Sequence, residues 1–444
     1  MTRSGRLLRV SAILAGAIAA AFVMTAAATP GPTPAATATP DPEADPIRAA
    51  EYWLDDYGIT EAWKTTRGKG VTIAVIDTGI ASGPAELDGA VAGGTDVSGV
   101  GSADGRTPVG AQDSSHGTLV GSVAAARGTG ADTGFIGVAP EAQLLSISVG
   151  FGASAAVPFV DQVPEAITWA VDHGADIINL SWTTNTLTWD ESWDEAFLHA
   201  FENDVVIVVA AGNRGAGTRV VGAPATIPGV LVVGGVDENG KASVEASTQG
   251  ITIGVAAPSE KLLGVAPDGQ VVTWNGTSGA APIVAGIAAL IRSAHPQLDA
   301  DNVINRIIRT ADPVPGTTPP DPEYGYGLVD AAEAVSANVA AVADNPLVDV
   351  ELKEWIRIYR RGDAQPAPTP TIGEVEVPPL PPAEPPTEAG PPWLPSPESL
   401  REGTLPLVAV SAAGILVTLG LVAVVRRIRT ARSRPSGHTQ SRSS

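Results

Sequence analysis

The sequence of 444 residues contains no cysteine, so disulfide bonds and thiolate metal sites are both excluded. Basic residues are also few. Of the 27 lysines and arginines, three lie in residues 1–28 and six in residues 426–444, which leaves 18 basic against 48 acidic residues, a net charge of −30, for residues 29–425. A chain this acidic lacks the basic surface that nucleic-acid binding requires, so no nucleic-acid partner is expected. Its hydrophobic fraction of 44% is nevertheless enough to bury a large core.

Both ends of the chain differ in composition from the middle. Residues 1–28 carry three arginines and no acid, followed by an alanine-rich apolar run that ends in small residues near Ala28; this pattern is typical of a cleaved export signal. The 21 residues 405–425 carry no charge, which is enough to cross a bilayer core of about 30 Å. The arginine-rich tail 426–444 follows at once and indicates the cytoplasmic side. We therefore expect a protein of the cell membrane, with one transmembrane helix and an extracytoplasmic globular part.

The region between the two ends divides again by composition. Residues 29–46 form a Pro/Thr-rich lead-in. Thirteen prolines fall within residues 364–398, and such a segment is an extended spacer of roughly 3 Å per residue. A stalk is therefore expected at 364–404. The globular domain is expected at 47–340, and the role of the short segment 341–363 is left open.

Within the expected domain, short runs rich in β-branched residues alternate with helical patterns. Alternation of this kind predicts an α/β fold, a parallel sheet with helices on both faces. Functional residues of such a fold lie at the carboxyl ends of strands and the amino ends of helices. The expected strands are 71–76, 143–149, 176–181, 205–211 and 230–236, and the expected helices are 116–126, 163–174, 190–203 and the apolar run after Ser278.

Four polar residues occupy such positions. Asp77 ends the first strand, His116 opens a helix, Asn213 follows a buried strand, and Ser278 precedes a long apolar run. Each has an ordinary explanation by itself, since Asp and Asn beside Gly favour turns and a serine before a helix is a common cap. Together they supply an acid, a base, an amide donor and a hydroxyl on one sheet.

Six motifs along the chain resemble the ordered series of the subtilisin-like serine proteases over roughly residues 70–335, with the order Asp, His, Ser. These motifs are AVIDTGI, HGTLVGSVAA, INLSW, VVAAGNRG, NGTSGAAPIVAGIAAL and YGYGLVDAAEAV. The resemblance implies a catalytic triad of Asp77, His116 and Ser278, with Asn213 in the oxyanion hole. It further implies that a polypeptide substrate pairs along two strand ends, at Leu180, Ser181, Trp182, Ala211 and Gly212.

The export signal, stalk, single span and arginine tail, together with the motif GVAPEAQLLSI, further resemble the mycosins, membrane-anchored subtilases linked to type VII secretion. This narrower resemblance implies a processing protease with a secretion-complex partner. Only 42 residues separate Ala28 from Val71, too few for the long propeptide of secreted subtilases, and mycosins also lack one. The absence of cysteine departs from the mycosin pattern.

Two places in the sequence, residues 182–183 and residue 279, depart from the usual subtilase pattern. Bulky residues, Trp182 and Thr183, stand where glycine-rich sequence usually forms one wall of the primary specificity pocket, so the side-chain preference stays open. Gly279 replaces a methionine common directly after the nucleophile. Because the only methionines are Met1 and Met24, a mature chain starting after Ala28 contains no sulfur, and we expect it to resist peroxide and a Gly279→Met variant to be sensitive.

Three alternatives stay open at this point. A second Asp-Thr-Gly at Asp132 suits an aspartic protease with a carboxylate dyad, but βα alternation contradicts the all-β fold of that class. The chain also suits a general cell-surface subtilase, or a catalytically silent module that uses the fold for binding or assembly. No cofactor is expected, and although calcium is common in the family, no ligand cluster is spaced clearly enough to assign a metal site.

Overall fold

The structure, a computed structural model, describes residues 45–110, 114–152 and 155–360, and a few helical residues at 411–413, 415–416 and 419–420. The expected export signal, stalk and cytoplasmic tail lie outside the described residues, as does most of the expected span. The chain divides into two units, Met1–Gln365 and Pro366–Ser444. The first unit carries the fold and the candidate site.

A seven-stranded parallel sheet forms the centre of the first unit, with the strand order β2-β3-β1-β4-β5-β6-β7. The five expected strands are all present, within one or two residues of their expected ends. Two further strands, β2 and β7, were not expected, because their glycine- and alanine-rich sequences VAGGTD and IGVAAP lack a strong strand pattern. The strands are β1 (Thr72–Asp77), β2 (Val91–Asp96), β3 (Gln143–Ser148), β4 (Ile177–Leu180), β5 (Val206–Ala210), β6 (Leu231–Val236) and β7 (Ile253–Pro258).

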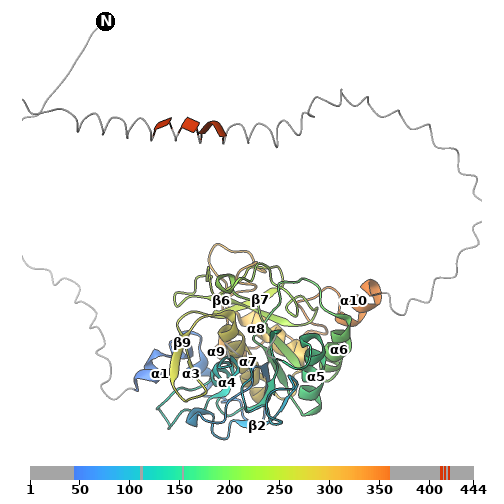
Figure 1. The fold of residues 1–444 in the computed structure, drawn as a ribbon. Coiled ribbons are helices and arrows are strands. Elements are labelled where there is room, and N and C mark those ends of the chain that lie inside the picture. The colour runs from blue at the N-terminus through green and yellow to red at the C-terminus, as the bar shows by residue number, and fades with distance from the viewer. Residues whose placement is uncertain are drawn as a thin grey trace, which may run out of the picture. The chain divides into compact units, whose positions relative to one another are not determined.

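Helices cover both faces of the sheet, as the sequence predicts. Successive residues of β1 point to opposite sides, with Ile73 and Val75 in one hydrophobic core and Ala74 and Ile76 in the other. The first core is covered by α4 (His116–Ala125), α7 (Thr277–Ala294), α8 (Ala300–Thr310) and α9 (Ala331–Ser336), and the second by α5 (Phe159–Asp172) and α6 (Asp194–Glu202). Figure 1 shows α5 and α6 together on one side of the domain.

Three helices differ from their expected bounds. The helix expected at 163–174 begins earlier, at Phe159, so Pro164 lies inside it and cannot donate to the Val160 carbonyl. That carbonyl accepts a hydrogen bond of 3.0 Å from Trp193 Nε1. The segment 190–203 is divided into a short 3-10 helix, Glu191–Trp193, and α6. The helix expected after Ser278 already includes that residue in its first turn.

Smaller elements complete the domain at both ends and beside the sheet. The N-terminal segment forms α1 (Pro46–Ala50), α2 (Trp53–Asp56) and α3 (Ile59–Ala62), and an antiparallel pair is formed by β8 (Leu262–Val265) and β9 (Val271–Trp274).

The segment 341–363, whose role the sequence left open, contains α10 (Leu352–Tyr359). Its Trp355 ring lies 4.4 Å from that of Trp189, and Arg360 is ion-paired with Asp194. These contacts fasten α10 to the domain beside α6.

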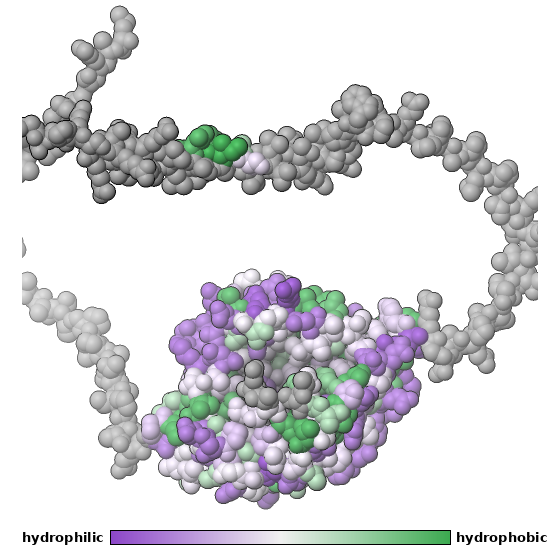
Figure 2. All heavy atoms as spheres, in the orientation of Figure 1, coloured by the Kyte–Doolittle hydropathy of each residue, from purple (hydrophilic) through white to green (hydrophobic). Residues whose placement is uncertain are grey.

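Among the described residues, one helix, α7, is long and apolar enough to cross a membrane, but 83% of it is buried inside the domain. It is therefore a core helix. On the face drawn in Figure 2, apolar residues form separate patches among hydrophilic ones rather than one continuous apolar area.

Candidate active site

A carboxylate and an imidazole meet at the carboxyl end of β1. Asp77, the last residue of that strand, is fully buried, and its Oδ1 accepts a hydrogen bond of 2.7 Å from the Thr78 backbone N–H. His116, the first residue of α4, places Nδ1 at 2.8 Å from Oδ1 and 2.9 Å from Oδ2 of Asp77. A carboxylate at this distance favours the tautomer with its proton on Nδ1, which puts the lone pair on Nε2.

Ser278 lies in the first turn of α7. The residue that caps this helix is Gly276, which offers no side-chain cap, so Ser278 is not the cap that its sequence context allows. Its Oγ instead donates a hydrogen bond of 2.9 Å to the Ser181 carbonyl, just after the end of β4. In the first turn its backbone N–H has no intrahelical acceptor and lies at the positive end of the helix dipole.

Asn213 is oriented by the residue before Ser278. Its Oδ1 accepts hydrogen bonds from the Thr277 backbone N–H at 2.8 Å and from Thr277 Oγ1 at 2.9 Å. The same Oγ1 accepts from the Gly212 N–H at 3.0 Å. Because Oδ1 is held by Thr277, the Nδ2 group faces away from Thr277. It donates no hydrogen bond to any acceptor in the described part of the chain. Thr277 is a site residue that the sequence reasoning missed, although its place beside Ser278 was a usable signal.

His116, Asn213 and Ser278 line one open cavity of 260 Å³, at the carboxyl ends of the adjacent strands β1, β4 and β5. The structure also brings Ser181, Trp182 and Gly212 to this cavity. It does not bring the side chains of Leu180 and Ala211 there, because both are fully buried in the core between the sheet and α5–α6.

The wall of the cavity beside Gly212 is closed by two threonines. A Cβ placed on Gly212 would lie 2.5 Å from Thr218 Cγ2 and 2.7 Å from Thr183 Cγ2, so both methyl groups already contact the open face of this glycine. Thr183 is held there by a hydrogen bond of 2.8 Å from its Oγ1 to the Gly222 carbonyl. Thr218 comes from a loop without any local sequence signal, and only the fold brings it to the cavity.

Trp182 lies beside these threonines as a nearly buried part of the wall. Its Nε1 donates a hydrogen bond of 3.0 Å to the Ile76 carbonyl, and its ring lies 5.0 Å from that of Phe159. Phe151, a further lining residue that the sequence did not indicate, is half-exposed 6.3 Å from the same ring. Trp182, one of the two bulky residues noted in the sequence, therefore packs as part of an aromatic wall.

Gly279 has a steric role. A Cβ at this position would lie 2.3 Å from Leu262 Cδ1, closer than real Cβ atoms approach another heavy atom, and 3.2 Å from Trp274 Cζ2. The crowding comes from Leu262 and Trp274 of the β8–β9 pair. A Gly279→Met substitution therefore disturbs packing around α7, so its peroxide sensitivity does not isolate the effect of a sulfur atom.

In the described residues, no group of three or more His, Asp or Glu side chains is arranged to hold a metal ion. Asp132, the second aspartate of an Asp-Thr-Gly triplet, is exposed in the loop after α4 and far in sequence from any described strand end. The parallel sheet and the place of Asp132 together show that the aspartic-protease alternative is wrong.

Residues 68–327 match the subtilase family model, which is more than half of the chain. The chain belongs to the subtilase family. It is 35% identical to mycosin-4 of Mycobacterium tuberculosis over 63% of this chain and 68% of that protein. It is 35% identical to subtilisin DY of Bacillus licheniformis over 60% of this chain and 92% of that protein. A solved structure of the MycP3 protease from the type VII (ESX-3) secretion system is similar, with 34% identity, a TM-score of 0.54, and 67% and 90% of the two chains covered. The protein is thus a subtilisin-like serine endopeptidase that resembles the mycosins.

Proposed function

We propose that this subtilase hydrolyses peptide bonds through Ser278, His116 and Asp77. Ser278 Oγ attacks the scissile carbonyl, and His116 Nε2 takes its proton and returns it to the leaving amine. Asp77 holds the imidazole orientation and stabilises the imidazolium that forms. The observation that carries this proposal is the Asp77–His116 pair, with Nδ1 at 2.8 Å from the carboxylate, opening on the cavity that Ser278 also lines.

The proposed oxyanion hole combines Asn213 Nδ2 with the Ser278 backbone N–H. Both groups develop their strongest interaction when the carbonyl oxygen becomes negative in the tetrahedral intermediate. Thr277 supports this role because its two hydrogen bonds to Asn213 Oδ1 fix which end of the amide faces away from α7.

The cavity beside Gly212 favours a small substrate side chain before the scissile bond. The methyl groups of Thr183 and Thr218 fill the space next to Gly212 where a larger side chain would have to enter. Hydrophobic pockets discriminate by roughly 1–3 kcal/mol per methylene. We therefore propose a selective protease that prefers alanine or glycine at this position, rather than a general digestive one.

We further propose that the enzyme is anchored in the cell membrane with its catalytic domain outside, and that it acts as a mycosin-like processing protease associated with type VII secretion. Support comes from the sequence of the two ends and from the similarity to mycosin-4 and to the MycP3 protease. Its proposed substrates and partners are extracytoplasmic polypeptides.

Labelling of the full chain with a fluorophosphonate probe tests the catalytic part of this proposal. We expect one adduct, on Ser278, and expect Ser278→Ala to abolish both labelling and peptide hydrolysis. An adduct on another residue, or no adduct on a folded protein, would favour the catalytically silent module.

A further inference from the structure

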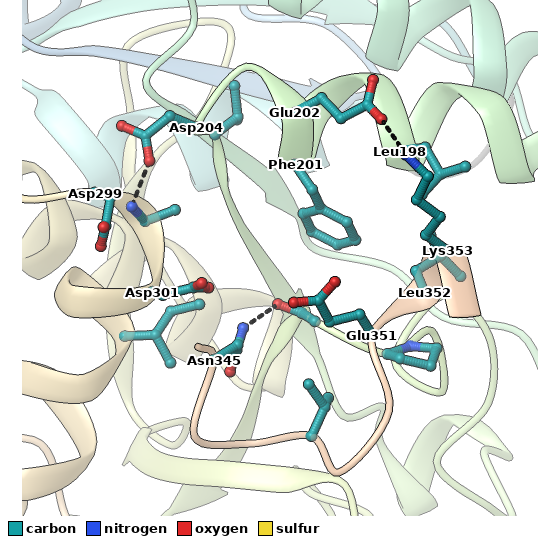
Figure 3. A pocket seen from close by; sticks show the side chains of 16 residues that line it. Leu198, Phe201, Glu202, Asp204, Asp299, Asp301, Asn345, Glu351, Leu352 and Lys353 are labelled. Atoms are coloured by element: carbon teal, nitrogen blue, oxygen red, sulfur yellow. Dashed lines mark hydrogen bonds and ion pairs between the residues drawn. The ribbon is translucent and has the colours of Figure 1, made fainter. Parts of the chain in front are cut away.

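A second cavity, of about 400 Å³, lies away from the candidate active site. It is formed by α6 and the residues that follow it, by the first turn of α8, and by residues 345–353 (Figure 3). Asp204 and Val205 precede β5, and Pro228 and Gly229 precede β6. The cavity therefore lies at the amino ends of these strands, whereas the active-site cavity lies at their carboxyl ends.

The walls of this cavity are mostly apolar and are firmly built. Val205, Ile304 and Leu352 are each 2% exposed and belong to the domain cores. The loop that closes one side is fixed by Asn345, whose Nδ2 donates a hydrogen bond of 3.1 Å to the Gly229 carbonyl. The remaining apolar lining residues are Leu198, Phe201, Pro228, Ala300 and Val348.

Five carboxylates line the same cavity, and three of them have partners. Glu202 lies 3.6 Å from Lys353 Nζ, and Asp204 lies 3.1 Å from Arg292 Nη1. Asp299 caps α8 by accepting a hydrogen bond of 2.9 Å from the Asn302 backbone N–H. These three negative charges are therefore already balanced or hydrogen-bonded within the domain.

The other two carboxylates, Asp301 and Glu351, form no hydrogen bond or ion pair with any described residue. They point into the cavity from opposite sides, one from α8 and one from the residue before α10 (Figure 3). Burial, and then the charges of Asp299 and Glu351 nearby, raise the pKa of Asp301 to about 6. The positive end of the α8 dipole amounts to only about half a charge. No full positive charge of the described domain is therefore paired with Asp301 or Glu351, and a bound cation would fill that role.

We propose that this cavity docks an arginine side chain of a partner polypeptide, with an apolar neighbour of that arginine on the cavity wall. The guanidinium would lie between Asp301 and Glu351. Asp301 is partly buried and Glu351 is exposed at the cavity mouth. Arginine suits such a pair better than lysine, because its planar group is less strongly hydrated and can donate to both carboxylates. Apolar walls around a small number of charged groups are typical of interface centres.

A partner is a better source of the arginine than this chain itself. Arginines are concentrated in residues 1–28, 357–361 and 426–444. In 357–361, Arg357 and Arg360 are already paired with Glu354 and Asp194. In the proposed topology residues 1–28 are removed and residues 426–444 lie across the membrane. The inference concerns a site away from Ser278, so it does not depend on the proposed catalytic mechanism.

Binding of a short peptide to the full chain in detergent micelles tests this inference, with Ser278→Ala in the background to prevent hydrolysis. The probe is a fluorescent, acetylated and amidated peptide of sequence Gly-Leu-Arg-Leu-Gly, followed by anisotropy. We expect saturable binding with a Kd of about 1 mM or tighter. Replacing arginine by its neutral analogue citrulline, or both leucines by glycine, is expected to weaken binding at least about tenfold.

Paired variants locate the site. Asp301→Asn with Glu351→Gln keeps the shape of both side chains and removes both charges, and it is expected to weaken binding at least about tenfold. Glu165→Gln, which removes an exposed charge on α5, is the matched control and should leave binding unchanged. Equal binding of the citrulline peptide, equal binding by the double variant with native thermal unfolding, or no saturable binding would overturn the proposal. If free arginine amide binds as tightly as the peptide, the site takes a small amine and the docking of a polypeptide is wrong.

Discussion

Glu51, in the segment that joins α1 to α2, is a buried carboxyl whose removal should stabilise the protein. Its side chain has no exposed surface. Oε1 accepts a hydrogen bond of 3.0 Å from the Ile136 backbone N–H, while Oε2 is buried without any hydrogen-bond partner among the described residues. Arg48 Nε lies 3.3 Å from Oε2 but donates its proton to the Gly134 carbonyl. Burial therefore dominates, and it raises the pKa of Glu51 to about 8 against the opposing effects of the Ile136 N–H and Arg48.

The raised pKa determines how stability depends on pH. Between pH 4.5 and about 8 the folded protein keeps the proton of Glu51 and the unfolded chain has lost it. The free energy of unfolding then falls by about 1.4 kcal/mol per pH unit as pH rises, and stability is fully present only below pH of about 4.5. A Glu51→Gln variant cannot ionise. We expect it to match the original protein near pH 4, and to exceed it by roughly 3 kcal/mol at pH 7 and up to roughly 5 kcal/mol above pH 8.

Chemical unfolding of the full chain in detergent, in a Ser278→Ala background that prevents self-digestion, measures this difference through tryptophan fluorescence. Trp53 is fully buried two residues from Glu51 and reports on the same region. Glu61→Gln in α3 is the matched control, because the Glu61 side chain is 60% exposed and pairs only with Lys64. Parallel pH profiles for the Glu51→Gln protein and the original would refute the reasoning, since they would mean that Glu51 ionises alike in both states.

Three further predictions concern catalysis and topology. Asn213→Ala should allow slow labelling of Ser278 but lower kcat by roughly two to three orders of magnitude, as loss of the oxyanion donor does in subtilisin itself; an unchanged kcat would remove Asn213 from the mechanism. Thr183→Gly should open the wall beside Gly212, so that kcat/KM for a peptide with phenylalanine before the scissile bond rises about tenfold or more relative to a peptide with alanine there. Fluorogenic peptides measure this ratio of kcat/KM values, and an unchanged ratio would contradict the proposed wall. The unaltered enzyme should digest casein poorly. Protease added to intact cells should release the catalytic domain by cutting at 364–398 and leave an epitope on the 426–444 tail intact; digestion of that epitope from outside would invert the topology.

The fold class and the places of four candidate site residues in the fold could be predicted from the sequence, because both depend on local pattern. Buried parallel strands are continuous apolar runs, and a residue that directly follows such a run must lie at the carboxyl edge of the sheet. This is why Asp77 and Asn213 could be assigned to one edge without coordinates. The strands β2 and β7 were not predicted because their glycine and alanine residues give a weak strand pattern. In β2 the glycine is needed despite its poor strand propensity, because a Cβ on Gly94 would lie 2.2 Å from the Asp104 carbonyl oxygen.

Contacts between distant segments were decided by the tertiary structure alone. The predicted pairing of a substrate with Leu180 and Ala211 involves their backbone and stays a prediction, whereas the register of the sheet turns both side chains into the core. Thr183 and Thr218 meet over Gly212 although 34 residues lie between them in the sequence. The docking cavity likewise joins α6, α8 and the segment before α10. Local periodicity fixes which face of an element is apolar, whereas the space left between elements depends on how their faces pack, and only the folded chain determines that.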